Sequence, residues 1–408
     1  MIQQLGYGVS GNIGVLGIAD SQGGYTYYAD YTSAMIAAES GDVVVQFANI
    51  VERKPITITL KNGVNINLNG FTYTVTTTGI YNFSTTAAIV CSINNGTITG
   101  GLSINNASAN ITTNCTINGT VLMNAGNLSS GVINGAVITP NVTSGNVTIN
   151  NVCVNGYGSF ALNSSTITIN NCIFFATGTL AVECNTQNGT RLQFNSCTFI
   201  SLAGYALCSN NGLNLRTYNC VCISTASVSL AVGTIGGGGE HTNLISISTA
   251  SFALLSINTT YYNVYAYTTG NNALGGNGSF IIMGSNTYSV YSNVFYGGTL
   301  ISTVAALIPN TVGNSATARN NSFIGTTLDC QWNNRAGYCV VNSNIVINCF
   351  LKTAHRKANA ITSTPNTENP VSCYAFNNTF LGMEKPIADN VILSQQNTPD
   401  LYDNILLG

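Results

Sequence analysis

Short stretches in which apolar and polar residues alternate recur along the chain. Each repeat contains two such stretches, with an Asn or Ser between them. "GNVTINNVCVNG" covers residues 145–156, "STITINNCIFFATG" covers 165–178, "TRLQFNSCTFIS" covers 190–201 and "NLRTYNCVCIS" covers 214–224. Alternation over four to six residues rich in Ile, Val, Thr and Phe predicts β-strands, and the intervening Asn and Gly predict turns. Helical periodicity is almost absent between residues 55 and 350.

The alternations return at a nearly constant interval. The residues that follow the key Asn or Ser align as Val152, Cys172, Cys197 and Cys220, and downstream as Ser322, Cys349 and Thr379. A period of about 20 to 30 residues is typical of a solenoid. A strand-rich coil of that length, stacked about 4.8 Å above the previous one, forms a parallel β-helix.

The repeated Asn has a physical role in such a coil. At a tight bend Asn tolerates left-handed backbone angles, and stacked copies can hydrogen-bond to one another along the axis. We therefore expect Asn170 and Asn171 to form a bend and an asparagine ladder. Cys172→Val is expected to be nearly silent, whereas Asn171→Leu is expected to lose buried hydrogen bonds.

One segment departs from the strand pattern. "DYTSAMIAAESGDVVVQF", residues 30–47, contains a Thr or Ser cap, an Ala/Met/Ile run and Gly41 as a stop signal. These features predict a short helix that covers the open end of the coils. We accordingly divide the chain into a Gly/Tyr-rich arm (1–29), a capping helix and entry (30–44), a parallel β-helix (45–385) and a tail (386–408).

The entry to the coils resembles a known family. The run "YTSAMIAAESGDVVVQF…ITITLKNGVNINLNGFTYT" is similar to the entry of right-handed parallel β-helices of the pectate-lyase-like superfamily, in which a capping helix ends in Gly-Asp. Phage tailspikes and other virion β-helices share this layout. The resemblance covers roughly residues 30–380 and implies an all-β fold, a right-handed parallel β-helix with a short N-terminal capping helix.

The composition changes this picture mainly by what it excludes. Only 6% of residues are charged and the net charge is -2, against about 25% charged residues in a typical soluble domain. No basic field is available for nucleic acid. No apolar run approaches the roughly 18 residues of a membrane span. We therefore expect neither a nucleic-acid partner nor a membrane span.

The chain has 13 cysteines, and five of them occupy strand positions where other repeats carry Val, Ser or Thr: Cys153, Cys172, Cys197, Cys220 and Cys222. This placement is typical of small buried apolar residues. No Cys-x-x-Cys pair is present and the only histidines are His241 and His355. We expect free core thiols in preference to a disulfide framework, and neither a metal nor a cofactor.

Enzymes of the family that the chain resembles usually act on polysaccharides, with clustered carboxylates on the outer face. The weak catalytic candidates in this chain are Glu183, Glu240, His241 and Asp329. Glu183 and Glu240 would lie about 12 Å apart along the axis, more than the usual hydrolase separation of about 5 to 9.5 Å. Glu240 and His241 follow "GTIGGGG", and we expect them to lie in water on a mobile loop.

Tyrosines form a separate signal, because a ring with a polar tip suits a sugar or a subunit interface. "TYYNVYAYTTG" is expected to place Tyr261, Tyr265 and Tyr267 on one face of a strand, and a second run adds further candidates. The candidate binding residues are Tyr261, Tyr265, Tyr267, Tyr288, Tyr291 and Tyr296. An interface is the favoured use.

Together these features predict a structural or adhesive virion protein of a bacteriophage: a tailspike, tail fibre or head-decoration protein, assembled in the host cytoplasm as a homotrimer. Its expected partners are other virion proteins and a host surface polysaccharide. The alternative is a polysaccharide depolymerase, hydrolase or lyase, with an active site between subunits. A third interpretation, an extracellular surface adhesin, requires export, and "MIQQLGYGVSG" lacks the pattern of a conventional export signal.

Overall fold

The computed structural model divides the chain into two compact units, residues 1–135 and 136–408. Apart from one helix, the described residues form β-strands, bends and turns. The backbone is described over residues 14–76, 81–142, 145–162, 166–178, 180–186, 191–209, 214–226, 230–232, 239–249, 253–256 and 259–268, and in further strands up to Leu407. Only the backbone is described at residues 140–142, 162, 185–186, 214, 230–232, 255–256, 259–260 and from 268 onward.

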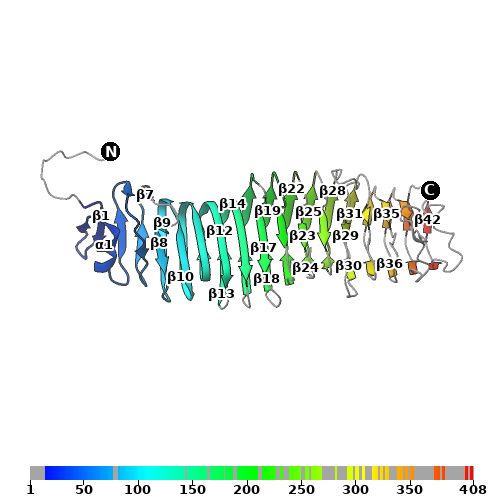
Figure 1. Ribbon diagram of the computed structural model, residues 1–408, viewed down its shortest axis with the longest axis horizontal. Coiled ribbons are helices and arrows are strands. Elements are labelled where there is room, and N and C mark those ends of the chain that lie inside the picture. The colour runs from blue at the N-terminus through cyan, green and yellow to red at the C-terminus, as the bar shows by residue number, and fades with distance from the viewer. Residues whose placement is uncertain are drawn as a thin grey trace, which may run out of the picture. The chain divides into compact units, whose positions relative to one another are not determined.

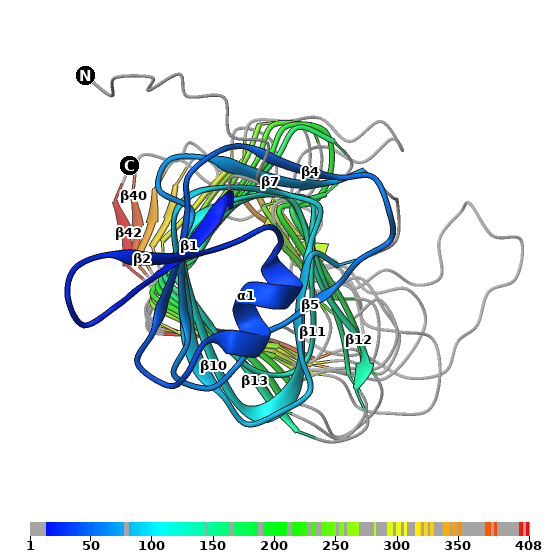
Figure 2. The same ribbon diagram turned by 90° about the vertical axis from the view of Figure 1, so that its left-hand side faces the viewer.

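The helix predicted near residue 30 is present as α1 (Tyr31–Ala37) and lies across the end of the first coils (Figure 2). Its N-cap is Asp30, whose carboxylate accepts a hydrogen bond from the Ser33 amide at 2.7 Å, so the predicted Thr or Ser cap is wrong. The Tyr31 side chain is fully buried, and its hydroxyl donates to Gln46 Oε1 at 2.8 Å. Its ring meets Tyr73 edge-on at 4.8 Å. The helix therefore covers the apolar interior of the unit, as predicted.

The segment expected to be an arm contains a β-hairpin. Strands β1 (Leu16–Ala19) and β2 (Tyr25–Tyr28) pair antiparallel. β1 also pairs antiparallel with β3 (Val43–Gln46), the strand that follows the helix. Residues 14–28 thus extend the sheet beside the helix, while residues 1–13 lie outside the described residues.

The first unit continues as parallel coils. Its short strands are β4 (Ile50–Glu52), β5 (Ile58–Thr59), β6 (Asn65–Asn67), β7 (Thr72–Val75) and β8 (Phe83–Thr85). The longer strands are β9 (Val90–Thr99), β10 (Leu102–Asn118) and β11 (Thr120–Ser129), and β12 (Val132–Val142) begins in the first unit and ends in the second. These long strands pass through the corners, so that β9, for example, pairs with both β6 and β7.

The second unit consists of three stacks of parallel strands, each in register with the next (Figure 1). The first stack contains β13 (Asn146–Asn150), β15 (Thr166–Asn170), β18 (Arg191–Asn195), β21 (Asn214–Tyr218), β24 (Gly239–Thr242) and β27 (Thr259–Tyr262). The second stack contains the start of β14 (Cys153–Leu162), then β16 (Ile173–Ala176), β19 (Thr198–Ser201), β22 (Val221–Ser224), β25 (Ile245–Ser248) and β28 (Tyr265–Thr268). The third stack contains the end of β14, then β17 (Val182–Thr186), β20 (Leu207–Ser209), β23 (Leu230–Val232) and β26 (Leu254–Ser256).

The backbone of the three stacks continues beyond residue 268. The first stack adds β30 (Ser292–Tyr296), β33 (Ser315–Arg319), β36 (Tyr338–Asn342), β39 (Ser372–Phe376) and β41 (Asp400–Tyr402). The second adds β31 (Thr299–Ser302), β34 (Ser322–Ile324), β37 (Ile345–Ile347), β40 (Thr379–Leu381) and β42 (Ile405–Leu407). The third adds β29 (Ile281–Ile282), β32 (Ala306–Leu307), β35 (Thr327–Asp329) and β38 (Phe350–Lys352). The tail expected over 386–408 thus includes two strands that extend the stacks.

The fold is the predicted right-handed parallel β-helix, an all-β solenoid with very little helix. The predicted column of Val152, Cys172, Cys197 and Cys220 is confirmed by the pairing of the strands that follow these residues. The downstream alignment is wrong in two respects. Ser322 is in line with Val221, one residue past Cys220. Ile345 takes the place given to Cys349, because "VNSNIVINCFLK" contains two similar matches to the repeat.

The repeated Asn serves the two predicted roles at two adjacent positions. The bend residue has a left-handed backbone, with φ of 54° at Asn151, 53° at Asn171 and 52° at Ser196. The preceding residues form the ladder: the Asn170 amide donates to Asn150 at 2.7 Å, and the Asn195 amide donates to Asn170 at 2.6 Å. Asn171, expected to hold buried hydrogen bonds, is exposed, so its role lies in the backbone conformation.

The interior of the second unit is packed by aromatic rings and thiols. Phe174 stacks on Phe199 with ring centroids 5.6 Å apart, and Phe194 meets Phe199 edge-on at 4.9 Å. All nine cysteines of the described part of the chain are free thiols, and eight of them are buried, in agreement with the prediction. In the described part there is no helix long and apolar enough to cross a membrane.

Candidate functional site

The two carboxylates considered for catalysis lie on different stacks. Glu183 is on β17 in the third stack, and Glu240 is on β24 in the first. β24 belongs to a coil three steps beyond that of β17, which at about 4.8 Å per coil is about 14 Å along the axis. The structure therefore does not bring Glu183 and Glu240 together as a pair.

Each of these carboxylates is engaged by neighbouring side chains. The Tyr157 hydroxyl donates to Glu183 Oε2 at 2.6 Å, and burial, together with this hydrogen bond, raises the pKa of Tyr157. The Tyr218 hydroxyl donates to Glu240 Oε1 at 3.4 Å, while Arg216 Nη2 lies 3.9 Å from Glu240 Oε2. The Arg216–Glu240 pair is long and about one-third exposed, so it contributes little to stability. Both carboxylates have the contacts of structural surface groups.

His241 does not lie in water on a mobile loop. It is on strand β24 with its ring fully buried, stacked on Tyr261 at 5.2 Å. Its Nδ1 is 2.8 Å from Thr217 Oγ1, and its Nε2 has no hydrogen-bond partner among the described residues. Burial lowers the pKa of His241 to about 3. The expectation that His241 lies in water is therefore wrong, because its neutral imidazole is buried inside the coil.

The predicted tyrosine face is divided by a bend at Asn263, which has φ of 50°. Tyr261 precedes the bend on β27 and is buried, so it is unsuited to surface binding and the predicted common face is wrong. Tyr265 and Tyr267 follow the bend on β28, with Tyr265 39% exposed. Tyr262, which was not among the predicted binding residues, is 42% exposed.

The other candidates lie beyond the fully described part of the chain. Asp329 and Tyr296 are on strands β35 and β30, for which only the backbone is described, and Tyr288 and Tyr291 lie outside the described residues. Within the described residues, no three His, Cys, Asp or Glu side chains converge in the manner of a metal site.

Outward residues of the first stack form a polar face. Counted from β13 to β27, the column before the bend is Asn150, Asn170, Asn195, Tyr218, Thr242 and Tyr262. A second outward column two residues earlier is Thr148, Thr168, Gln193, Arg216 and Glu240. Amides, hydroxyls and phenol rings therefore follow one another at the pitch of the coils.

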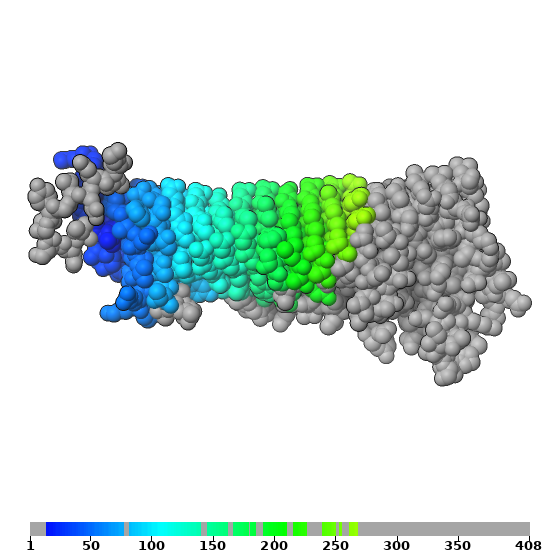
Figure 3. Space-filling view, turned by 90° about the horizontal axis from the view of Figure 1, so that it is seen from above, coloured from blue at the N-terminus to red at the C-terminus, as the bar shows by residue number. Residues whose placement is uncertain are grey.

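Outward residues of the second stack form an apolar face. On β16, β19, β22, β25 and β28 the first outward column is Ile173, Thr198, Val221, Ile245 and Tyr265. The second outward column is Phe175, Ile200, Ile223, Ile247 and Tyr267. Ile173 is 46% exposed and Ile245 40%. The successive coils of this region, coloured green, form regular parallel ridges in the space-filling view (Figure 3).

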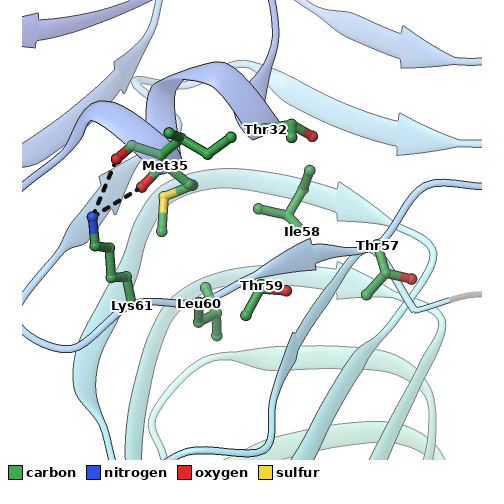
Figure 4. A pocket seen from close by; sticks show the side chains of 8 residues that line it. Thr32, Met35, Thr57, Ile58, Thr59, Leu60 and Lys61 are labelled. Atoms are coloured by element: carbon green, nitrogen blue, oxygen red, sulfur yellow. Dashed lines mark hydrogen bonds between the residues drawn. The ribbon is translucent and has the colours of Figure 1, made fainter.

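A small hollow in the first unit lies between α1 and β5 (Figure 4). It has a volume of about 440 Å³ and is lined by Thr32, Met35, Ile36, Thr57, Ile58, Thr59, Leu60 and Lys61. Its one charged group, the Lys61 ammonium, is held by the carbonyl oxygens of Met35 at 3.4 Å and Ile36 at 3.3 Å. Because these carbonyls end the helix, Lys61 is a capping residue and the hollow has no group placed for catalysis.

No known protein-family model matches the chain, and no curated protein matches it.

Proposed function

We propose that the protein is a structural and adhesive component of a bacteriophage particle, which binds a neutral surface glycan or another virion protein without cleaving it. The position in a virion is supported by the resemblance of the cap and first coils to virion β-helices. The polar face supports the binding role. The proposal that the protein does not cleave its ligand depends on one observation, the separation of Glu183 and Glu240 on different stacks.

The polar face suits an uncharged polysaccharide. Amide and hydroxyl groups can exchange hydrogen bonds with sugar hydroxyls, and phenol rings provide an apolar surface with a polar tip. Tyr218 and Tyr262 belong to the same outward column, and Thr242 lies between them. The pitch of about 4.8 Å places one outward polar or phenol group of this column at each coil, so an extended ligand along the stack meets a hydrogen-bonding group at each step.

The experiment is a combined binding and cleavage assay. The full chain is applied to an array of purified bacterial surface polysaccharides, and each polysaccharide that is retained is then incubated with the protein and analysed for new reducing ends and unsaturated sugars. We expect retention of at least one neutral polysaccharide and no new ends. Tyr262→Ala is expected to weaken this binding by about tenfold or more, the usual effect of removing an aromatic contact.

Tyr27→Ala is the matched control, because Tyr27 is 58% exposed on β2 in the other unit. Equal loss of binding in both variants would contradict the assignment to the polar face. Sustained cleavage that is abolished by Glu240→Gln would replace the proposal with the depolymerase alternative.

A further inference from the structure

We infer that the apolar face of β16, β19, β22, β25 and β28 is the surface on which copies of this chain associate with one another. This inference goes beyond the proposed function: it concerns the homo-oligomer that the sequence predicted, and it does not depend on which ligand the polar face binds.

The contrast between two neighbouring faces of the same coils is the first observation. At equivalent outward positions the first stack carries Thr168, Gln193 and Arg216. The second stack carries Phe175, Ile200 and Ile223 on the same coils. Both faces belong to one solenoid with the same geometry, so the difference lies in what each face meets. A contiguous apolar surface of this kind marks an interaction site.

The inward residues of the second stack make the contrast stronger. Ser201, Ser224 and Ser248 are fully buried at the strand position next to Ile200, Ile223 and Ile247, so hydroxyls point inward and isoleucines outward. The buried hydroxyls are used: Ser224 Oγ donates to the Gly204 carbonyl at 2.7 Å, and Ser201 Oγ accepts from the Gly204 amide at 3.0 Å.

A shift of one residue would exchange the two faces of such a strand. It would bury Ile223 in place of a serine, which favours the shifted register by the hydrophobic effect alone. The hydrogen bonds of the serines and the phenylalanine packing next to them hold the observed register instead. The outward isoleucines are therefore a fixed feature of the surface, and they gain their burial from a partner.

A second copy is the occupant that this face fits. The ten residues of the face include no charged group, so a charged partner would gain no complementary contact. A flat face with a pitch of about 4.8 Å is matched along its whole length by an identical face with the same pitch. Side chains of one copy can then lie between the ridges of the other.

The area of the ladder sets the expected strength of the contact. Five coils at about 4.8 Å, with two columns about 7 Å apart, present on the order of 300 Å². The register continues through β31, β34, β37, β40 and β42, where the position of Tyr267 is taken by Ile301, Ile324, Ile347, Leu381 and Leu407. The position of Tyr265 is taken on the same strands by Thr299, Ser322, Ile345, Thr379 and Ile405, so one of the two columns is mixed there. With one apolar column continued, the ladder reaches on the order of 450 Å², about half of the roughly 800 Å² per partner of a standard interface.

The test is the oligomeric state of the full chain, measured by sedimentation velocity over a hundredfold range of concentration. The wild type is expected to sediment as a defined multiple of 42.6 kDa. Ile173→Glu/Ile245→Glu is expected to weaken association by at least about 100-fold, since each Glu would be buried in the contact without a partner. The matched control is Thr148→Glu/Thr168→Glu, with the same charge change on the polar face, and is expected to sediment as the wild type.

If the double Glu variant does not fold, photo-cross-linking provides a second test of the inference. With benzoylphenylalanine in place of Val221, irradiation is expected to join two copies, whereas the same group in place of Gln193 is expected to give no dimer. A monomeric wild type, an oligomer that survives Ile173→Glu/Ile245→Glu in a folded variant, or cross-linking at Gln193 alone would each overturn the inference. A monomer that still binds a polysaccharide overturns only the inference, and an oligomer that binds none overturns only the proposed ligand.

Discussion

Asn170 and Asn171 are adjacent, but the structure gives them different tasks, and this difference can be tested by replacing each with Ala and with Gly. Asn171 has φ of 53°, in the left-handed region. A Cβ is unfavourable there by about 1 to 2 kcal/mol, and Asn tolerates the conformation better than Ala does. We expect Asn171→Ala to destabilise the protein by about 1 kcal/mol and Asn171→Gly to be close to neutral, because Gly has no Cβ.

Asn170 is a strand residue whose side chain makes two ladder hydrogen bonds, at 2.7 Å to Asn150 and 2.6 Å from Asn195. Loss of both bonds at a half-buried site is expected to cost about 1 to 2 kcal/mol in Asn170→Ala. Asn170→Gly is expected to cost a further 0.5 to 1 kcal/mol or so, because Gly in a strand adds backbone entropy to the unfolded state. The order of Ala and Gly is therefore opposite at the two positions.

The assay is urea denaturation followed by circular dichroism, with amide hydrogen exchange of residues 166–201 to localise the change if the coils do not unfold in one step. Comparison of Ala with Gly at one position cancels the loss of the Asn side chain, so the sign of the difference reports the backbone alone. If Ala and Gly rank in the same order at both positions, the division of tasks between bend and ladder is refuted.

Three further predictions concern buried groups and the cap. His241 is neutral in both states above pH 6.5, but below that pH the unfolded chain takes up the proton first, because the pKa of His241 is lowered to about 3 in the fold. The contribution of His241 to the free energy of unfolding should fall by about 3 kcal/mol between pH 7 and pH 4. Urea titrations at the two pH values should show this loss in the wild type and not in His241→Phe. An equal loss of stability in both proteins would contradict the prediction. Cys172 Sγ accepts a hydrogen bond from the Val152 amide at 3.4 Å, so Cys172→Val, which the sequence predicted to be nearly silent, should cost about 1 kcal/mol of stability. Phe174→Ala should cost about 3 to 5 kcal/mol. If thermal unfolding ranks the two variants in reverse, the packing is misassigned. Lys61→Met should accelerate amide exchange in α1 by about fivefold through the loss of about 1 kcal/mol of capping, and unchanged exchange would show that Lys61 is not a cap.

The sequence predicted the elements whose signal is local. Asn at the bends, the alternation beside it and the Ala/Met/Ile run of α1 each depend on the conformational preferences of a few residues, and each was found where expected. The pattern could not settle which face was outward in "NCIFFATG", because Ile173 and Phe174 are both apolar and alternation alone assigns neither to the core. The structure places Phe174 inside and Ile173 outside.

The location of the candidate site residues was less predictable for the same reason. Glu240 and His241 follow a glycine run that is typical of a loop, but pairing with β21 draws both into a strand, and the alternation of the strand turns His241 inward. Tyr261 was placed with Tyr265 because both belong to one tyrosine-rich run. The bend at Asn263 between them changes the face, and only the register of successive coils reveals that bend.

The most direct test of the account is a cryo-electron microscopy reconstruction of the purified full chain, at a resolution that separates the strands of successive coils. We expect two or more copies that meet along β16, β19, β22, β25 and β28, with Ile173 and Ile245 buried in the contact and Asn170, Asn195 and Tyr262 left at the surface. Copies that meet through the polar face, or single copies with Ile173 and Ile245 in water, would contradict it.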